Sequence, residues 1–369
     1  MTLRSKVLLC AAVVASAPAW AQSGSVTVYG VLDEALEYNS GLNGNYREQA
    51  NPGQWRLGLG SVPSRLGFRG EEDLGGGYRA LFTLESGLNV DTGMLGQGGR
   101  MFGRQSWVGL AGEYGTVSAG RQYTMRYYGM LDADFFGSGS LGLGTLDSGI
   151  PNARADNALS YRGTFGAFSV GAQYSFGRDT ASGNNPAATN CPGESTDATQ
   201  CREWSLMGKY DGGNWGLVSA YERLYGGTAG TYGGLTSPSL TDSRLTVNGY
   251  LKMTNGRVGL GWLGRDNEGS PATPKSNMFW LEGELTVWAP FVLTGVVAQV
   301  KFDNSPDKAT EVALRANYWL SKRTTVYVAD AYVDNGGKLA LPASTNSPGT
   351  PPLPGKSQNA FQVGVSHVF

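Results

Sequence analysis

Apolar and polar residues alternate along most of this chain, and the alternation limits the folds that it can adopt. The pattern is clear between Tyr78 and Asn89, and it recurs at 244–253, 257–265 and 311–318. Successive side chains of a β-strand point to opposite faces, so each segment predicts a strand with one apolar and one polar face. A soluble two-layered sheet has the same period, so alternation alone leaves a β-sandwich open.

The lengths of the connections favour a barrel. Seven short turns are expected, at 73–77, 113–115, 163–166, 211–214, 254–256, 289–290 and 320–323. Eight longer connections are expected near 39–54, 90–99, 122–153, 178–202, 226–241, 267–276, 304–308 and 334–357. Such an alternation predicts sixteen strands with short turns on the periplasmic rim and long loops outside. Because backbone groups in lipid need partners, we predict an all-β, closed, 16-stranded antiparallel transmembrane β-barrel.

The N-terminal segment predicts export. Arg4 and Lys6 precede an apolar run, and Ala19 and Ala21 are the small residues that a signal peptidase reads. We therefore expect residues 1–21 to be a secretory signal peptide, and 22–369 to be one mature barrel domain. A transmembrane helix is the alternative, but the run is short for a bilayer. Without the signal, 27 Lys and Arg face 30 Asp and Glu, which offers no basic surface to nucleic acid.

The mature chain keeps two cysteines. Cys191 and Cys201 lie in a stretch rich in Gly, Asn, Pro and Thr. In an oxidising exported compartment we expect them to form a disulfide, with two free thiols as the alternative. The single histidine, His367, is far from both, so we expect no metal site and no cofactor.

The connection at 122–153 is too long for a simple loop. It is rich in aromatic and apolar residues, and Asp132, Asp134 and Asp147 are its only acids. A long loop in a compact domain is either functional or disordered, and its composition favours packing inside the barrel. There it would narrow the channel and set Asp132 and Asp134 opposite basic wall residues. An exterior loop is the alternative.

Several segments together resemble a known family. The residues at 64–77, 84–93, 102–105, 115–123 and 320–324 are similar to landmarks of Gram-negative general porins, the betaproteobacterial type especially. The similarity runs from Ser25 to Phe369. The last strand alternates up to Phe369, as in the final strand of an outer-membrane barrel, so Phe369 is the expected C-terminal assembly signal.

The resemblance implies a homotrimer in the outer membrane, a third loop folded into each lumen, and an arginine cluster facing loop acids. Arg65 and Arg104 match the family's first two wall arginines, and Arg154 matches the third less closely. The family's Pro-Glu-Phe-Gly turn is replaced by Asp134-Phe-Phe-Gly137, so Asp132 or Asp134 would supply the acid. Further residues expected to line the pore are Arg69, Glu71, Arg121 and Arg126.

The expected function is passive diffusion of small hydrophilic solutes and ions through a water-filled channel. The excess of arginines over loop aspartates predicts a weak preference for anions. Expected partners are membrane lipid and lipopolysaccharide. A substrate-specific channel is the alternative; an exported soluble adhesin is another. An enzyme is disfavoured, because no nucleophile and base can be assembled around His367.

Overall fold

The computed structural model describes residues 24–42, 53–179, 191–194, 196–228, 232–346 and 351–369. The expected signal peptide lies outside the described residues and stays a prediction. The elements are β1 (Ser25–Asn39), β2 (Gln54–Gly58), β3 (Arg65–Gly75), β4 (Tyr78–Asn89), β5 (Met94–Leu95), α1 (Gly96–Gly99), β6 (Gln105–Gly112), β7 (Gly115–Tyr123), α2 (Met125–Met130), η1 (Leu143–Thr145), β8 (Arg154–Phe165), β9 (Phe168–Ser175), β10 (Glu203–Asp211), β11 (Trp215–Tyr225), η2 (Tyr232–Gly234), β12 (Thr241–Met253), β13 (Gly256–Asn267), β14 (Lys275–Trp288), β15 (Phe291–Phe302), β16 (Lys308–Trp319), β17 (Thr324–Gly336) and β18 (Gln358–Val368).

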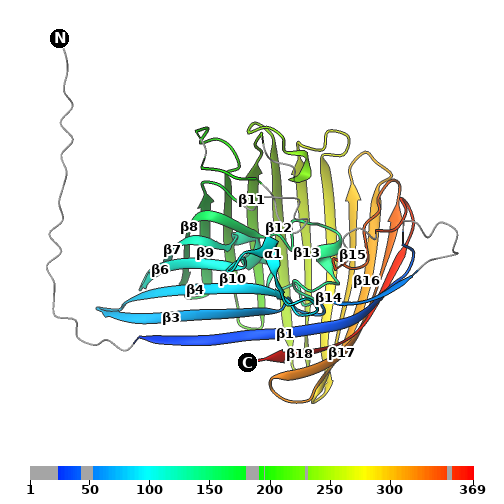
Figure 1. Cartoon of the computed structure of the whole chain (residues 1–369), viewed down its shortest axis with the longest axis horizontal. Coiled ribbons are helices and arrows are strands. Elements are labelled where there is room, and N and C mark those ends of the chain that lie inside the picture. Colours follow the sequence, from blue (N-terminus) through cyan, green and yellow to red (C-terminus); the bar gives the residue numbers. More distant parts are fainter. Residues whose placement is uncertain (1–23, 43–52, 180–190, 195, 229–231, 347–350) are drawn as a thin grey trace, which may run out of the picture.

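Sixteen of these strands form a closed antiparallel wall. Each pairs with its neighbours in chain order, and β1 pairs with both β3 and β18, which closes the barrel (Figure 1). The two short strands β2 and β5 are additions on β1 and β4. The predicted fold and all seven short turns are confirmed. In the part of the chain that the structure describes, no helix could cross a membrane.

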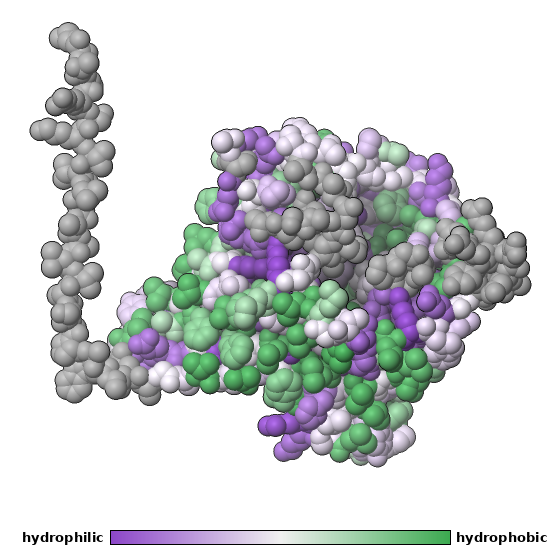
Figure 2. Space-filling view, in the orientation of Figure 1, coloured by the Kyte–Doolittle hydropathy of each residue, from purple (hydrophilic) through white to green (hydrophobic). Residues whose placement is uncertain are grey.

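The outer face of the wall is apolar. Outward-facing side chains such as Phe279, Leu281, Val297 and Leu314 are more than half exposed. Figure 2 shows large hydrophobic areas over the wall and hydrophilic residues gathered around the upper rim. This is the distribution expected of a wall surrounded by lipid hydrocarbon.

The long connection after β7 packs inside the barrel, as predicted. We call residues 124–153, which include α2 and η1, the constriction loop. Its apolar residues pack against the inner face of β13 to β18, for example Phe136 and Leu143 in one cluster with Met278 and Trp280. Trp280 Nε1 donates to the Ala133 carbonyl oxygen at 2.9 Å. Strands on this side of the barrel are therefore apolar on both faces.

Candidate channel constriction

Glu85 of β4 is the centre of a polar cluster on the inner wall. Its carboxylate accepts hydrogen bonds from Arg104 Nε at 2.7 Å and from the Tyr29 hydroxyl at 2.9 Å. Arg65 Nε lies 3.8 Å from the same carboxylate. One acidic side chain therefore serves two guanidinium groups.

Tyr123 connects this cluster to a third arginine. Its hydroxyl oxygen accepts from Arg104 Nη2 at 2.6 Å and from Arg154 Nη2 at 3.1 Å. The Arg154 guanidinium also lies 4.6 Å from the Tyr123 ring centroid, and Tyr127 stacks on that ring at 3.7 Å. We call Arg65, Arg104 and Arg154 the arginine cluster.

Strand register explains why these residues meet. Gly67 of β3 pairs with Glu85 of β4, which places Arg65 beside the carboxylate. Glu85 also pairs with Gln105 of β6, so Arg104 lies next to it. The pairing register of β3, β4 and β6 therefore brings Arg65, Glu85 and Arg104 together.

The three arginines differ in exposure. The Arg65 side chain is 26% exposed, whereas that of Arg104 is 3% exposed. Arg154 is buried under the tyrosines. The Arg65 guanidinium is therefore exposed to the lumen, whereas the guanidinium groups of Arg104 and Arg154 are buried behind it.

The loop acids do not face this cluster as expected. Asp132 Oδ2 lies 2.8 Å from Lys209 Nζ on β10, which is a basic wall residue but not one of the three arginines. The Asp134 carboxylate accepts from the Gly137 N–H of its own loop at 2.8 Å. The path of the loop along β10 to β16 carries both acids to that side of the barrel, where Glu282 and Arg315 are neighbours of Asp134.

Wall carboxylates hold the tip of the constriction loop. Glu282 accepts from the Phe135 and Phe136 N–H groups. Glu311 accepts from the Gly142 N–H at 2.9 Å and from the Thr145 hydroxyl at 2.8 Å.

Burial raises the pKa of the Asp134 carboxyl to about 6, although the Gly137 N–H and Arg315 oppose the shift.

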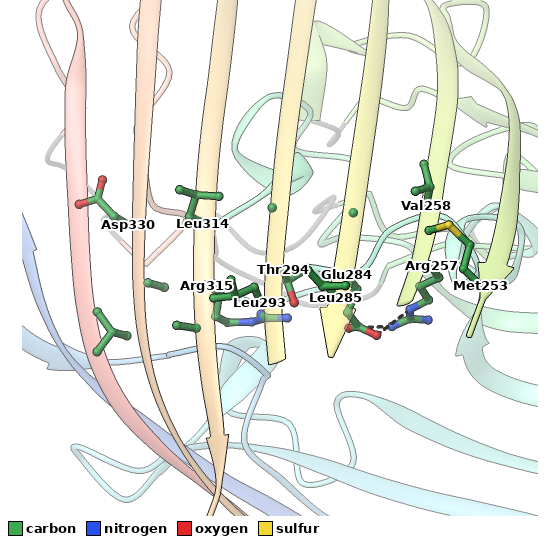
Figure 3. Close-up of a pocket in the computed structure, with 15 residues that line it drawn as sticks. Met253, Arg257, Val258, Glu284, Leu285, Leu293, Thr294, Leu314, Arg315 and Asp330 are labelled. Atoms are coloured by element: carbon green, nitrogen blue, oxygen red, sulfur yellow. Dashed lines mark hydrogen bonds and ion pairs between the residues drawn. The ribbon is translucent and has the colours of Figure 1, made fainter. Parts of the chain in front are cut away.

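Aromatic loop residues lie under wall arginines. Arg162 is 4.1 Å from the Tyr128 ring centroid, Arg257 is 4.1 Å from that of Phe135, and Arg315 is 4.7 Å from that of Phe136. Such cation–π contacts are attractive without neutralising the arginine charge. Figure 3 shows Arg257 reaching its ion-pair partner Glu284, with Arg315 at a similar level of the wall.

A second charged cluster fixes the end of the constriction loop. Arg244 Nε lies 3.1 Å from Asp147 Oδ2, and both side chains are almost fully buried. Burial opposes ionisation of Asp147, but Arg244 and Arg265 outweigh it and hold the pKa of this carboxyl below its usual range. This end of the loop is thus tied to β12.

The remaining predicted pore residues have separate positions. Arg69 is exposed, 5.5 Å from the Tyr29 ring centroid, and Glu71 pairs with Arg79 at 2.9 Å. Arg121 pairs with Asp156 at 2.7 Å. The prediction that Arg126 lines the pore is wrong: its side chain is 1% exposed and pairs with Glu222 at 2.8 Å, because α2 packs against β10 and β11.

Two further predicted positions are at opposite ends of the barrel. Cys191 and Cys201 are joined by a disulfide with a Cα–Cα distance of 5.3 Å. At the periplasmic end, the backbone N–H of Phe369 donates to the Gly30 carbonyl at 3.1 Å, and the reverse bond has the same length. Phe369 thus extends the seam between the first and last strands.

Sequence reasoning missed the tyrosines of the cluster. Tyr123 ends the segment 115–123, and Tyr29 lies near the start of the similarity at Ser25, but neither is among the predicted pore residues. The alternation of residues in their strands places both tyrosines on the inward face near Glu85, and this pattern could have identified them. Among the described residues, no group of three or more His, Cys, Asp or Glu could hold a metal.

Comparison with known proteins decides the family. The sequence model of the Gram-negative porin family matches residues 8–338. The chain belongs to the Gram-negative porin family. An outer membrane porin protein of Bordetella pertussis is 29% identical to it, over 99% of this chain and all of that protein. Outer membrane porin protein 32 of Delftia acidovorans is 28% identical over the full length of both.

Solved structures agree with this assignment. An anion-selective porin from Comamonas acidovorans has 26% identity and a TM-score of 0.75, covering 94% of this chain and all of that one. A trimer form of OmpT of Vibrio cholerae shares the fold at 18% identity with a TM-score of 0.64, covering 94% of this chain and all of that one. This porin is therefore an outer-membrane protein whose channel allows small hydrophilic solutes and ions to diffuse passively.

Proposed function

We propose that the porin prefers anions, and that the arginine cluster is the cause. The observation that carries this proposal is the charge count at the cluster: Arg65 and Arg104 share one carboxylate, Glu85, and Arg154 joins them through the neutral Tyr123 hydroxyl. The loop acids Asp132 and Asp134 are paired or hydrogen-bonded elsewhere. An uncompensated positive wall attracts anions into a narrow aqueous passage and repels cations. The porin from Comamonas acidovorans, which shares this fold, is itself anion-selective.

The test is the zero-current potential of the purified protein in a planar bilayer under a KCl gradient. The wild type should give a potential of the sign that chloride permeation produces. In Arg65→Gln the anion-to-cation permeability ratio should fall by up to roughly tenfold, because removing one unit charge about 6 Å away in water disfavours chloride and favours potassium by about threefold each. Arg79→Gln is the matched control, because Arg79 is a luminal arginine already paired with Glu71. A potential of the potassium-permeation sign in the wild type would refute the proposal.

The porin would act as a homotrimer. The Glu34 side chain points outward from β1 between the exposed Leu32 and Leu36, and its Oε1 has no partner among the described residues. A carboxylate facing lipid is unfavourable, which supports a neighbouring copy covering this face. Membrane lipid and lipopolysaccharide would surround the assembled trimer. In mild detergent, the particle mass should be three times that of the mature chain; a monomer would contradict this.

Catalysis would have no part in this function. His367 Nδ1 lies 2.9 Å from the Thr324 hydroxyl, and His367 pairs with the outward-facing Leu32, whereas the arginine cluster faces the lumen. A general base needs a nucleophile and an orienting partner within hydrogen-bond reach. His367→Gln should leave conductance and ion preference unchanged.

A further inference from the structure

Two outward-facing glycines lie side by side in the barrel wall. Gly283 of β14 pairs directly with Gly295 of β15. The same row continues to Val258 of β13 on one side and to Leu314 of β16 on the other. The neighbouring rows carry large side chains: Leu281 and Val297 toward the extracellular side, Leu285 and Leu293 toward the periplasm. The paired glycines therefore interrupt a continuous apolar surface.

The interruption is part of a groove of about 540 Å³ that crosses the wall from β12 to β17. Figure 3 shows Met253 and Val258 at one end of it and Asp330 at the other. Met253 is the last residue of β12 before a short periplasmic turn, so this end opens at the periplasmic edge. Asp330 lies in the middle of β17, and its carboxylate accepts from Asn359 Nδ2 at 2.7 Å. The groove thus climbs from the periplasmic edge to the middle of the wall.

We propose that this groove binds one acyl chain of a phospholipid from the periplasmic leaflet. The groove faces hydrocarbon, and an apolar cavity of this kind does not hold water. A chain lying over Gly283 and Gly295 contacts Leu285, Leu293 and Leu314, gaining the dispersion energy that a gap would forfeit. The headgroup stays at the periplasmic edge near Met253. The hydrogen-bonded pair of Asp330 and Asn359 marks the other end of the apolar groove.

The position of the groove favours lipid over a second copy of the chain. Glu34, whose Oε1 has no hydrogen-bond partner among the described residues and supports a subunit contact, is on β1. Strands β15 to β18 separate β1 from Gly283 on β14, whereas β18 alone separates β1 from the Asp330 end of the groove on β17. The floor of the groove therefore lies on a different part of the wall from the proposed subunit contact.

The chain offers a matched pair of variants. A Cβ added at Gly283 would meet nothing within 4 Å, and the same is true at Gly208 on the outer face of β10. A leucine fits at either position, but only Gly283→Leu fills the groove. Gly283→Ala is a milder second variant if the leucine variant fails to assemble.

The experiment places the full-length mature protein in vesicles of phosphatidylethanolamine and phosphatidylglycerol with a photoreactive diazirine on the phosphatidylethanolamine acyl chain. Labelled peptides are then mapped by mass spectrometry. Wild type and Gly208→Leu should be labelled at 281–297 and 314–328, and Gly283→Leu roughly tenfold less, as expected when about two methylene groups lose their apolar contacts. Gly283→Ala should give intermediate labelling.

Two results would overturn the proposal. Equal labelling of these segments in all variants would mean that the groove holds no particular chain. Dissociation of the oligomer in Gly283→Leu, without a change in labelling, would mean that a second copy of the protein fills it. Neither result bears on the anion preference, which depends on inward-facing residues.

Discussion

Tyr123 holds two arginines of the cluster through one oxygen atom. Arg104 and Arg154 both donate to it, and neither is exposed enough to be fully served by water. Buried guanidinium groups need such acceptors, because an unsatisfied buried charge is costly. The tyrosine therefore allows like charges to lie close together behind Arg65.

Removing this hydroxyl should weaken the barrel without reversing its ion preference. We expect Tyr123→Phe to lower the free energy of unfolding by about 2 kcal/mol, since hydrogen bonds to charged groups are worth roughly 1.5–3 kcal/mol. Urea titration in lipid vesicles measures this change. Tyr161→Phe is the control, because that hydroxyl donates to the Tyr114 carbonyl at an exposed site. Equal stability of Tyr123→Phe and wild type would show that the shared oxygen is unimportant.

Asp134 should make the stability of the porin depend on pH. Its folded-state pKa of about 6 lies above the ordinary carboxyl value near 3.9. The folded protein therefore binds the proton more tightly, so this stabilisation is complete below about pH 4 and is lost as pH rises through 6.

Replacing the carboxyl by an amide should remove this dependence. Asp134→Asn should match wild type at pH 4 and exceed it at pH 8 by at most about 3 kcal/mol, since each pKa unit corresponds to about 1.4 kcal/mol. Urea unfolding at pH 4, 6 and 8 tests the difference. Parallel pH curves for the two proteins would contradict the expectation.

Among the structural elements, the constriction loop is held to the wall at two places, by hydrogen bonds at its tip and by an ion pair in its C-terminal part. Its tip rests on carboxylates of β14 and β16 that accept backbone N–H groups. Its C-terminal part is tied to β12 through the buried pair of Asp147 and Arg244. Truncating one partner of a buried ion pair leaves an uncompensated charge.

Asp147→Asn should therefore loosen the loop. The expected cost is about 3 kcal/mol or more, together with faster amide hydrogen exchange at 143–153 and noisier single-channel current. Glu71→Gln, which breaks the exposed pair with Arg79, should cost less than about 1 kcal/mol. Unchanged exchange at 143–153 in Asp147→Asn would show that packing alone holds the loop.

At the scale of the whole molecule, closure depends on a close approach at the seam. A Cβ added at Gly30 would overlap the Phe369 ring and would lie 2.7 Å from the Arg65 carbonyl oxygen. The ring can move, but the backbone oxygen between β1 and β3 cannot do so without breaking the ladder. A side chain at this position is therefore incompatible with the seam.

Gly30→Val should prevent assembly. The variant should lack the folded form that changes mobility on heating in gel electrophoresis, whereas Gly208→Val, with open space at its Cβ, should retain it. A heat-modifiable Gly30→Val would show that the seam can rearrange.

Local sequence patterns were enough to predict the wall of the barrel. Strand periodicity and short turns are local properties, so sixteen strands, the turn positions and the inward direction of Arg65 could be predicted without knowing any distant contact. The inward path of the long loop followed from its aromatic content. Even the family resemblance rested on short contiguous segments.

The contacts of the constriction loop and the outer groove could not be predicted from local patterns, because they join residues that are distant in the chain. Asp132 meets Lys209, and Phe135 meets Glu282, which lies 147 residues away in the chain. Gly283 and Gly295 form a gap only because their strands pair in one register. Such contacts depend on the three-dimensional path of the chain around the barrel, which no local pattern encodes. For that reason the sequence predicted the arginines but not which acids would face them.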